Sequence, residues 1–288
     1  MNNHKLRNWG IFILLSLIWG SSFILMKKGS ENLTGIQIGA LRIFSAGLVF
    51  IPFALFHISK IPIKKLPLVV TSGLLGNFFP AFLFAIAIEH IESSMEGIMN
   101  SLTPLFVIII GVLFFKAKMP NRKIAGVLIG FIGLLILSFA KGSVSAGNLG
   151  YTLLILLATF FYGLNVNIVS HYLKDVDPLK MATVSLAILS IPAGIIAWQQ
   201  NVFAIAQFDE GAVWSIAASV LLGVVGSAIA TVLFYGLIRS AGGLFASLVT
   251  YAIPIVSILW GLLDHENVTL VQVGCLGIIL GGVYLANK

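Results

Sequence analysis

The chain has 288 residues, of which 59% are hydrophobic and only 9% are charged, and its formal net charge is +7. Soluble domains carry about 25% charged residues, so this composition excludes a protein whose whole surface faces water. Lipid is its main solvent. About ten membrane-spanning helices of roughly 20 residues would use nearly the whole chain, which leaves no stretch for a soluble catalytic or nucleotide-binding domain.

Apolar runs separated by charged or turn-rich breaks predict an all-α integral membrane fold, because a backbone in lipid must form its hydrogen bonds within its own helix. The ten expected spans cover residues 9–27, 35–57, 66–89, 93–115, 122–140, 149–172, 178–198, 213–238, 242–263 and 268–287. The first run follows basic residues, as in a signal peptide, but it continues to about residue 26. We therefore interpret it as an uncleaved span.

The positions of Lys and Arg indicate the orientation. If the N-terminus is cytoplasmic, the inner segments hold 13 of these residues, the outer segments hold 3, and Arg42 lies inside a span. Because cytoplasmic loops carry the excess of positive charge, both termini are expected in the cytoplasm of a multi-pass inner (plasma) membrane protein. This pattern accounts for the basic charge without nucleic acid as a partner. The single cysteine, Cys275, excludes an intramolecular disulfide.

A weak internal repeat divides the chain. Trp19-Gly20 recurs as Tyr162-Gly163, 143 positions later, and Pro104 recurs as Pro254, 150 positions later. These matches predict two five-helix halves, residues 1–142 and 148–288, joined near Lys141. Because five is odd, the second half enters the membrane the opposite way up. Inverted-topology repeats around a central site are a common design of transporters.

Four short motifs carry a family resemblance: residues 17–23 (LIWGSSF), 40–44 (ALRIF), 102–105 (LTPL) and 252–255 (AIPI). On these motifs the chain resembles the drug/metabolite transporter superfamily, specifically its ten-helix EamA-type permeases. The resemblance implies a secondary carrier, often an exporter of amino acids or other metabolites in a bacterial inner membrane. Where the family often has an acid after the fourth span, this chain has Lys116 or Lys118; the matching Glu266 after the ninth span is present.

Ionisable residues inside spans are the first candidates for function, because each costs about 2.5–3.5 kcal/mol on insertion scales. Arg42 lies about seven residues into the second span, and Glu96 and Asn100 share one face of the fourth. We expect Arg42 to hold a substrate carboxylate and Glu96 an amine or a proton. The alternative is a structural Arg42–Glu96 ion pair that never touches substrate.

Further polar and aromatic residues predict the wall of a cavity for a small amphipathic solute. Trp19 with Ser22 and Tyr162 with Asn165 are the repeat-related candidates of the first and sixth spans. The remaining candidates are Asn77, Ser227, Tyr235, Thr250 and Tyr251. The alternative is that these side chains only form hydrogen bonds between helices.

The two repeated prolines are candidate gate hinges. A proline inside a helix removes one backbone hydrogen bond and kinks the helix, so Pro104 and Pro254 would free carbonyl groups near Asn100 and Thr250. Those carbonyls are expected to face solute. The alternative is a static kink that aids packing.

These features together predict an exporter of small metabolites, such as amino acids or related amphipathic solutes, that works by alternating access without a cofactor or metal. The cavity is expected between spans 1–4 and 6–9, and spans 5 and 10 at the periphery or at a homodimer contact. An intramembrane enzyme is one alternative, but His-Glu-x-x-His and Gly-x-Ser-x-Gly motifs are absent. A lipid scramblase or passive channel is another.

Overall fold

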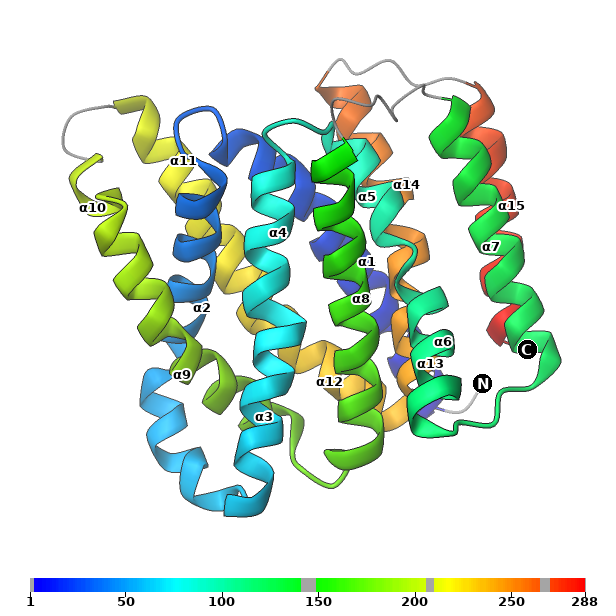
Figure 1. The fold of residues 1–288 in the computed structure, drawn as a ribbon, viewed down its shortest axis with the longest axis horizontal. Coiled ribbons are helices and arrows are strands. Elements are labelled where there is room, and N and C mark those ends of the chain that lie inside the picture. Colours follow the sequence, from blue (N-terminus) through cyan, green and yellow to red (C-terminus); the bar gives the residue numbers. More distant parts are fainter. Residues whose placement is uncertain (1–2, 141–148, 206–209, 265–269, 288) are drawn as a thin grey trace.

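The computed structural model describes residues 3–140, 149–205, 210–264 and 270–287, and within these ranges the fold is helical with no strand (Figure 1). Six helices run without interruption: α1 (Asn3–Gly29), α2 (Gly35–His57), α7 (Asn121–Ala140), α8 (Leu149–Tyr172), α9 (Pro178–Gln199) and α15 (Leu270–Asn287). The expected junction near Lys141, and Glu266, lie outside the described residues. The all-α prediction is confirmed for the part described.

Two expected spans contain a π-helical segment in the middle. The third consists of α3 (Leu66–Gly73), η3 (Leu74–Phe78) and α4 (Phe79–Ala87), and the eighth consists of α11 (Glu210–Leu221), η5 (Leu222–Ile229) and α12 (Ala230–Ala241). A π-helical turn widens the helix and redirects backbone carbonyls, and such turns occur frequently at functional sites. Hydropathy alone does not predict these segments.

Two other expected spans are broken into shorter helices. The fourth divides into α5 (Ser93–Asn100) and α6 (Thr103–Phe115), and the ninth into α13 (Gly243–Ser247) and α14 (Val249–Leu263). Short helical pieces connect other parts of the chain: η1 (Ile58–Lys60), η2 (Ile63–Lys65) and α10 (Val202–Ile205). The breaks bring four helix ends into the interior of the protein.

The two prolines therefore sit in different contexts. Pro104 lies in the first turn of α6, where a helix has no intrahelical partner for its N–H groups, so Pro104 does not kink a continuous helix. Pro254 does lie inside α14. The expected mid-helix kink at Pro104 is therefore wrong. The helix is instead interrupted by a turn at Ser101 and Leu102, directly before α6.

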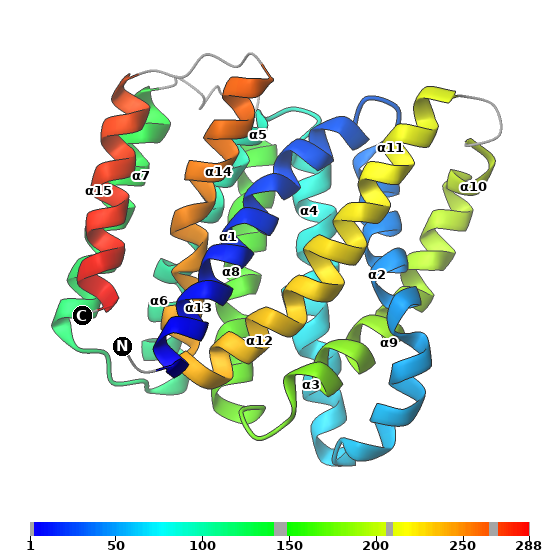
Figure 2. The same ribbon diagram turned by 180° about the vertical axis from the view of Figure 1, so that it is seen from behind.

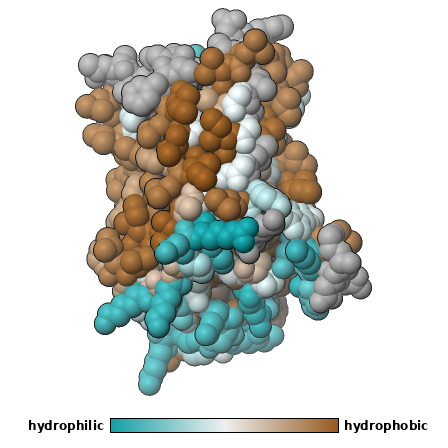
Figure 3. All heavy atoms as spheres, turned by 90° about the vertical axis from the view of Figure 1, so that its right-hand side faces the viewer, coloured by the Kyte–Doolittle hydropathy of each residue, from teal (hydrophilic) through white to brown (hydrophobic). Residues whose placement is uncertain are grey.

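The outer surface is suited to lipid. Eight described helical segments are long and apolar enough to cross a membrane, and α7 and α15 are two further helices of 20 and 18 residues. Leu113, Phe114 and Trp214 are 69%, 71% and 80% exposed, which would be unfavourable in water over so large an area. Figure 3 shows a hydrophobic surface above a lower end where hydrophilic side chains gather.

Close backbone contact joins helices from the two halves of the chain. A Cβ atom on Gly47 of α2 would lie 2.2 Å from the carbonyl oxygen of Leu186 in α9, and one on Gly282 of α15 would lie 2.5 Å from that of Gly126 in α7. These two helix pairs make the most extensive interhelical contacts of the fold. As expected for the fifth and tenth spans, α7 and α15 lie together at one edge (Figures 1 and 2).

Helices of each half also pack against helices of the other half. Helix α1 of the first half packs on α14 of the second, and α8 of the second half packs on α6 of the first. The α1–α14 contact includes a hydrogen bond from Trp260 Nε1 to Ser21 Oγ at 2.8 Å. The interior between the halves is consequently lined by helices from both.

Candidate functional site

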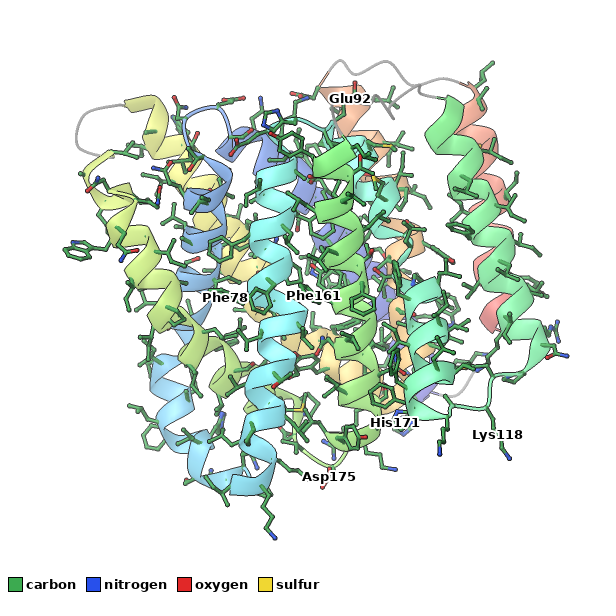
Figure 4. All side chains as sticks on the ribbon, in the orientation of Figure 1. Phe78, Glu92, Lys118, Phe161, His171 and Asp175 are labelled. Atoms are coloured by element: carbon green, nitrogen blue, oxygen red, sulfur yellow. The ribbon has the colours of Figure 1, made fainter. Side chains whose placement is uncertain are left out.

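The interior contains a cavity lined by polar and aromatic side chains, with an internal volume of about 50 Å³, or about 690 Å³ when the open space at its mouth is included. Nine of the twelve predicted binding residues line it: Trp19, Ser22, Arg42, Asn77, Asn100, Tyr162, Asn165, Tyr235 and Thr250. Phe78, next to Asn77, and Phe161, next to Tyr162, lie about midway between the two ends of the molecule (Figure 4). The cavity is therefore near the middle of the helices.

The other three predicted residues lie outside the cavity lining. Ser227 is buried and accepts a hydrogen bond from Arg42. Tyr251 points away, because its hydroxyl donates to the carbonyl of Val127 in α7 at 3.1 Å. Glu96 is completely buried in α5.

Sequence reasoning missed several apolar parts of the wall. Phe23 and Met26 line the cavity beside Trp19 and Ser22, so one face of α1 contributes positions i, i+3, i+4 and i+7. That spacing was a usable signal. The other lining residues absent from the twelve are Gly76, Phe84, Thr103, Gly226, Thr231 and Phe234.

Arg42 is the charged group of the cavity wall. Its side chain is 7% exposed, and Nε donates to Ser227 Oγ at 2.8 Å. Among the described residues, its terminal Nη atoms have no hydrogen-bond partner. A guanidinium presents a fork of N–H donors that matches a carboxylate, so the half of this fork that faces the cavity is available to a ligand.

Glu96 lies close enough to Arg42 for their charges to interact, but no direct ion pair within 4 Å joins them among the described residues. Both carboxyl oxygens of Glu96 are buried without a hydrogen-bond partner in the part of the chain that the structure describes. An ionised carboxylate in this position would be costly, because nothing replaces its hydration. The arrangement suits a group that takes up and releases a proton.

Small residues at the π-helical segments allow close approach of polar side chains. Trp19 Nε1 donates to the carbonyl of Gly226 in η5 at 3.0 Å. A Cβ on Gly76 of η3 would lie 2.3 Å from Asn165 Nδ2, and one on Gly226 would lie 3.1 Å from Ser22 Oγ. Each π-helical segment is thus in contact with a polar residue of the other half.

The two carbonyls expected to face solute are bonded to hydroxyl groups of the protein. Thr103 Oγ1 donates to the carbonyl of Asn100 at 2.8 Å, and Ser101 Oγ donates to the carbonyl of Thr250 at 2.7 Å. The second bond crosses from the first half to the second. Backbone groups freed at the helix breaks are thereby satisfied without water, as the interior of a membrane requires.

Polar contacts join the two halves of the chain at the end that carries Glu92 (Figure 4). Lys27 and Lys28 reach Asp264 at 2.6 Å and 3.6 Å, and Asn32 Nδ2 donates to Ser215 Oγ at 3.1 Å. The hydrogen bond from Lys27 holds the pKa of Asp264 below its usual range. This charge contact is therefore present at neutral pH and is lost only as the pH falls through the lowered pKa.

Different contacts join the two halves at the opposite end, where Lys118, His171 and Asp175 lie (Figure 4). Lys65 forms an ion pair with Asp175, and its hydrogen bond lowers the pKa of that carboxyl. The centroid of the His171 ring lies 4.9 Å from that of the Phe115 ring.

The described residues contain no group of three or more potential metal ligands.

A bundle of helices long enough to cross a membrane, arranged around an interior cavity with polar and aromatic walls, is typical of membrane transport proteins. The chain belongs to the EamA-like transporter family, whose model matches residues 8–139 and again residues 149–288. It is therefore a multi-pass membrane transporter, and the family resemblance read from its motifs is confirmed.

The relatives are transporters by name. An uncharacterized transporter of Archaeoglobus fulgidus is 25% identical over 98% of this chain and 99% of its own, and the uncharacterized inner membrane transporter YedA of Escherichia coli is 25% identical over 97% and 90%. A probable amino-acid metabolite efflux pump of Escherichia coli is 26% identical over 43% of this chain and 40% of its own. A crystal structure with 18% identity matches the fold with a TM-score of 0.67 over 96% and 95% of the two chains.

Proposed function

We propose that the protein is a secondary exporter of small amphipathic metabolites that works by alternating access. In this proposal, residues 1–142 and 148–288 are inverted five-helix halves, α7 and α15 are the fifth and tenth spans, and both termini are cytoplasmic. The observation that carries it is the cavity, which is lined by matched residues from both halves.

The matching of the cavity wall supports the repeat. Trp19 with Tyr162 and Ser22 with Asn165 are pairs 143 positions apart, and both members of each pair line the cavity. The same holds for three pairs 150 positions apart, which are Gly76 with Gly226, Phe84 with Phe234, and Asn100 with Thr250. The exchanged helix contacts and the double match of one family model agree with this arrangement.

The topology has support from the distribution of charge. The start of α1 and the end of α15 lie at the same end of the molecule as Lys118 and Asp175 (Figures 1, 2 and 4). This end carries the basic loops that the positive-inside rule assigns to the cytoplasm. The end with Glu92 is then the outer one.

The contacts at the two ends are also related by the repeat. Asn32–Ser215 corresponds to Asp175–Lys65, with offsets of 143 and 150 positions. Lys28–Asp264 corresponds approximately to His171–Phe115, with offsets of 143 and 149 positions. We call the contacts of Asp264 and Asn32 the outer latch, and those of Asp175 and His171 the inner latch. Alternating access requires two such closures that open in turn.

A matched pair of substitutions tests the latches. Asp264→Asn is expected to favour opening to the outside and Asp175→Asn opening to the cytoplasm. Exposed ion pairs contribute about 0.2–1 kcal/mol, so each shift is expected to be roughly 1.5- to 5-fold. The measurement is the rate at which a membrane-impermeant maleimide labels Thr231→Cys in the cavity wall, from each side, with Cys275→Ser present in every variant. Equal changes from both sides would contradict the assignment.

Export itself is tested by profiling the metabolites that cells release. Cells that overproduce the wild type are compared with cells that carry Arg42→Ala, at matched membrane levels and without preselection of solutes. We expect a few related metabolites to accumulate outside only with the wild type. The name of the partly matching efflux pump supports amino-acid metabolites as the first class to inspect. No difference between the two strains would argue against export of common metabolites.

A further inference from the structure

Repeat-related residues line the cavity in pairs, but the charge in the cavity wall is not paired in this way. Five repeat-related pairs line it, whereas Arg42 has no equivalent there. The residue 143 positions after Arg42 is Ser185, which is completely buried in α9 and donates to the carbonyl of Ala182 at 3.3 Å. One positive charge therefore stands on one side of a cavity that is otherwise lined by neutral groups.

The surroundings hold this charge in place. Ser227 Oγ accepts a hydrogen bond from Arg42 Nε, and this bond restrains the guanidinium group. Close packing fixes the backbone as well, because a Cβ on Gly223 would lie 2.4 Å from the carbonyl oxygen of Arg42. The unpaired Nη donors then meet a ligand in one orientation. A ligand that brings a carboxylate to them supplies the missing partner of a buried cation.

The described cavity wall offers no equivalent site for an ammonium group. The cavity lining includes no acidic residue. Glu96 is completely buried outside the lining. Glu89 lies at the end of the helices, where its carboxylate accepts a hydrogen bond from the backbone N–H of Gly35. A cation would meet the charge of Arg42, and Glu96, although its charge reaches Arg42, is not part of the cavity lining. The expectation that Glu96 holds a substrate amine therefore lacks a contact surface in this structure.

The remainder of the wall suits an apolar body. Trp19, Phe23, Phe84 and Phe234 line the cavity, and the rings of Trp19 and Phe234 are in edge contact with centroids 5.0 Å apart. Apolar walls with a few polar groups that fix orientation are typical of small-molecule sites. The aromatic residues supply the wall, and Arg42 supplies the charged anchor.

We propose that the cavity binds an amphipathic monocarboxylate, with the carboxylate on the Arg42 guanidinium and the apolar body among Trp19, Phe84 and Phe234. It selects against the corresponding zwitterions and amines. The proposal deepens the transport function above and rests on the same cavity.

Ligand probes with the same ring and nearly the same length test this selectivity. Purified wild-type protein in detergent is titrated with 3-phenylpropionate, phenylalanine, 2-phenylethylamine and 3-phenyl-1-propanol, and with hexanoate as an aliphatic carboxylate. Binding is read from the increase in melting temperature and from tryptophan fluorescence. We expect the carboxylates to bind at least 10-fold more tightly than the amine, the zwitterion and the alcohol.

Arg42→Gln is expected to weaken binding of the carboxylates by about 10- to 100-fold, because it removes charge-assisted hydrogen bonds. Arg122→Gln is the matched control, since it removes an exposed arginine at the start of α7 and should leave binding unchanged. If Arg42→Gln does not fold, Arg42→Lys, which keeps the charge but not the fork, should show an intermediate loss.

Three outcomes would overturn the proposal: preferred binding of the amine or zwitterion, equal carboxylate affinity in a folded Arg42→Gln variant, or no carboxylate binding to the wild type. Because binding in detergent does not require flux, the two proposals can fail separately. Carboxylate-selective binding without export would refute the exporter alone, and export of an amine would refute the carboxylate selectivity alone.

Discussion

Replacing Glu96 by glutamine is expected to abolish transport driven by a pH gradient while leaving the protein folded. Glu96 is completely buried, its two carboxyl oxygens lack partners among the described residues, and its charge interacts with that of Arg42. In this setting the protonation of Glu96 changes the affinity of Arg42 for a ligand, and a bound ligand changes the affinity of Glu96 for a proton. Proton movement and substrate movement are therefore coupled. Glutamine has the same shape but cannot release a proton.

Proteoliposomes separate this coupling from binding and movement of the substrate. The variant should lose accumulation driven by an imposed pH gradient, and it should retain exchange of the released metabolite down its own gradient. Glu92→Gln is the control, because Glu92 is exposed and precedes the same helix, α5. An unchanged pH dependence in Glu96→Gln would remove Glu96 from the coupling role.

A single methyl group on Gly47 is expected to lower the stability of the protein strongly. Its Cβ would lie 2.2 Å from the carbonyl oxygen of Leu186 and 2.4 Å from Cβ of Ser190, and neither atom belongs to the end of a flexible side chain. Helices α2 and α9 would have to separate. Overpacking of this kind costs about 1–3 kcal/mol, and displacement of backbone places Gly47→Ala at the upper end of that range.

Gly236→Ala is the matched control for this measurement. Gly236 lies within α12, and an added Cβ would meet nothing within 4 Å. Alanine favours a helix by up to about 1 kcal/mol relative to glycine, so this variant should be as stable as the wild type or more stable. Melting temperatures in detergent compare the two, and a Gly47→Ala variant as stable as the wild type would show that the α2–α9 contact can relax.

Much of the fold was predictable because charges and turns interrupt the apolar runs. The expected ranges 35–57 and 149–172 coincide with α2 and α8. The helix breaks and π-helical segments were not predictable, because hydropathy measures the apolar length of a segment and not its backbone bonding. Whether a break is stable depends on distant groups, such as the Ser101 hydroxyl that bonds the carbonyl of Thr250.

The candidate site was predictable in its polar part. A polar or ionisable side chain at membrane depth needs a partner or a cavity, and this reasoning selected Arg42 and Asn165, which line one. It could not distinguish a residue that faces the cavity from one that faces a neighbouring helix, as Tyr251 does. Phe84 and Phe234 escaped notice because an aromatic residue in a cavity wall has the same composition signal as one that packs against lipid or helix.

The exchange of neighbours between the halves has a consequence for biosynthesis. Because α1 packs on α14 and α7 on α15, two helices of the first half acquire their partners only when residues 249–287 have left the ribosome. Until then, the glycine-bearing face of α7 and the α14-facing side of α1 are covered by lipid or by the insertion machinery. Assembly of this transporter is therefore expected to be completed only after α14 and α15 have been inserted, and loss of these helices should leave the first half inserted but open to degradation.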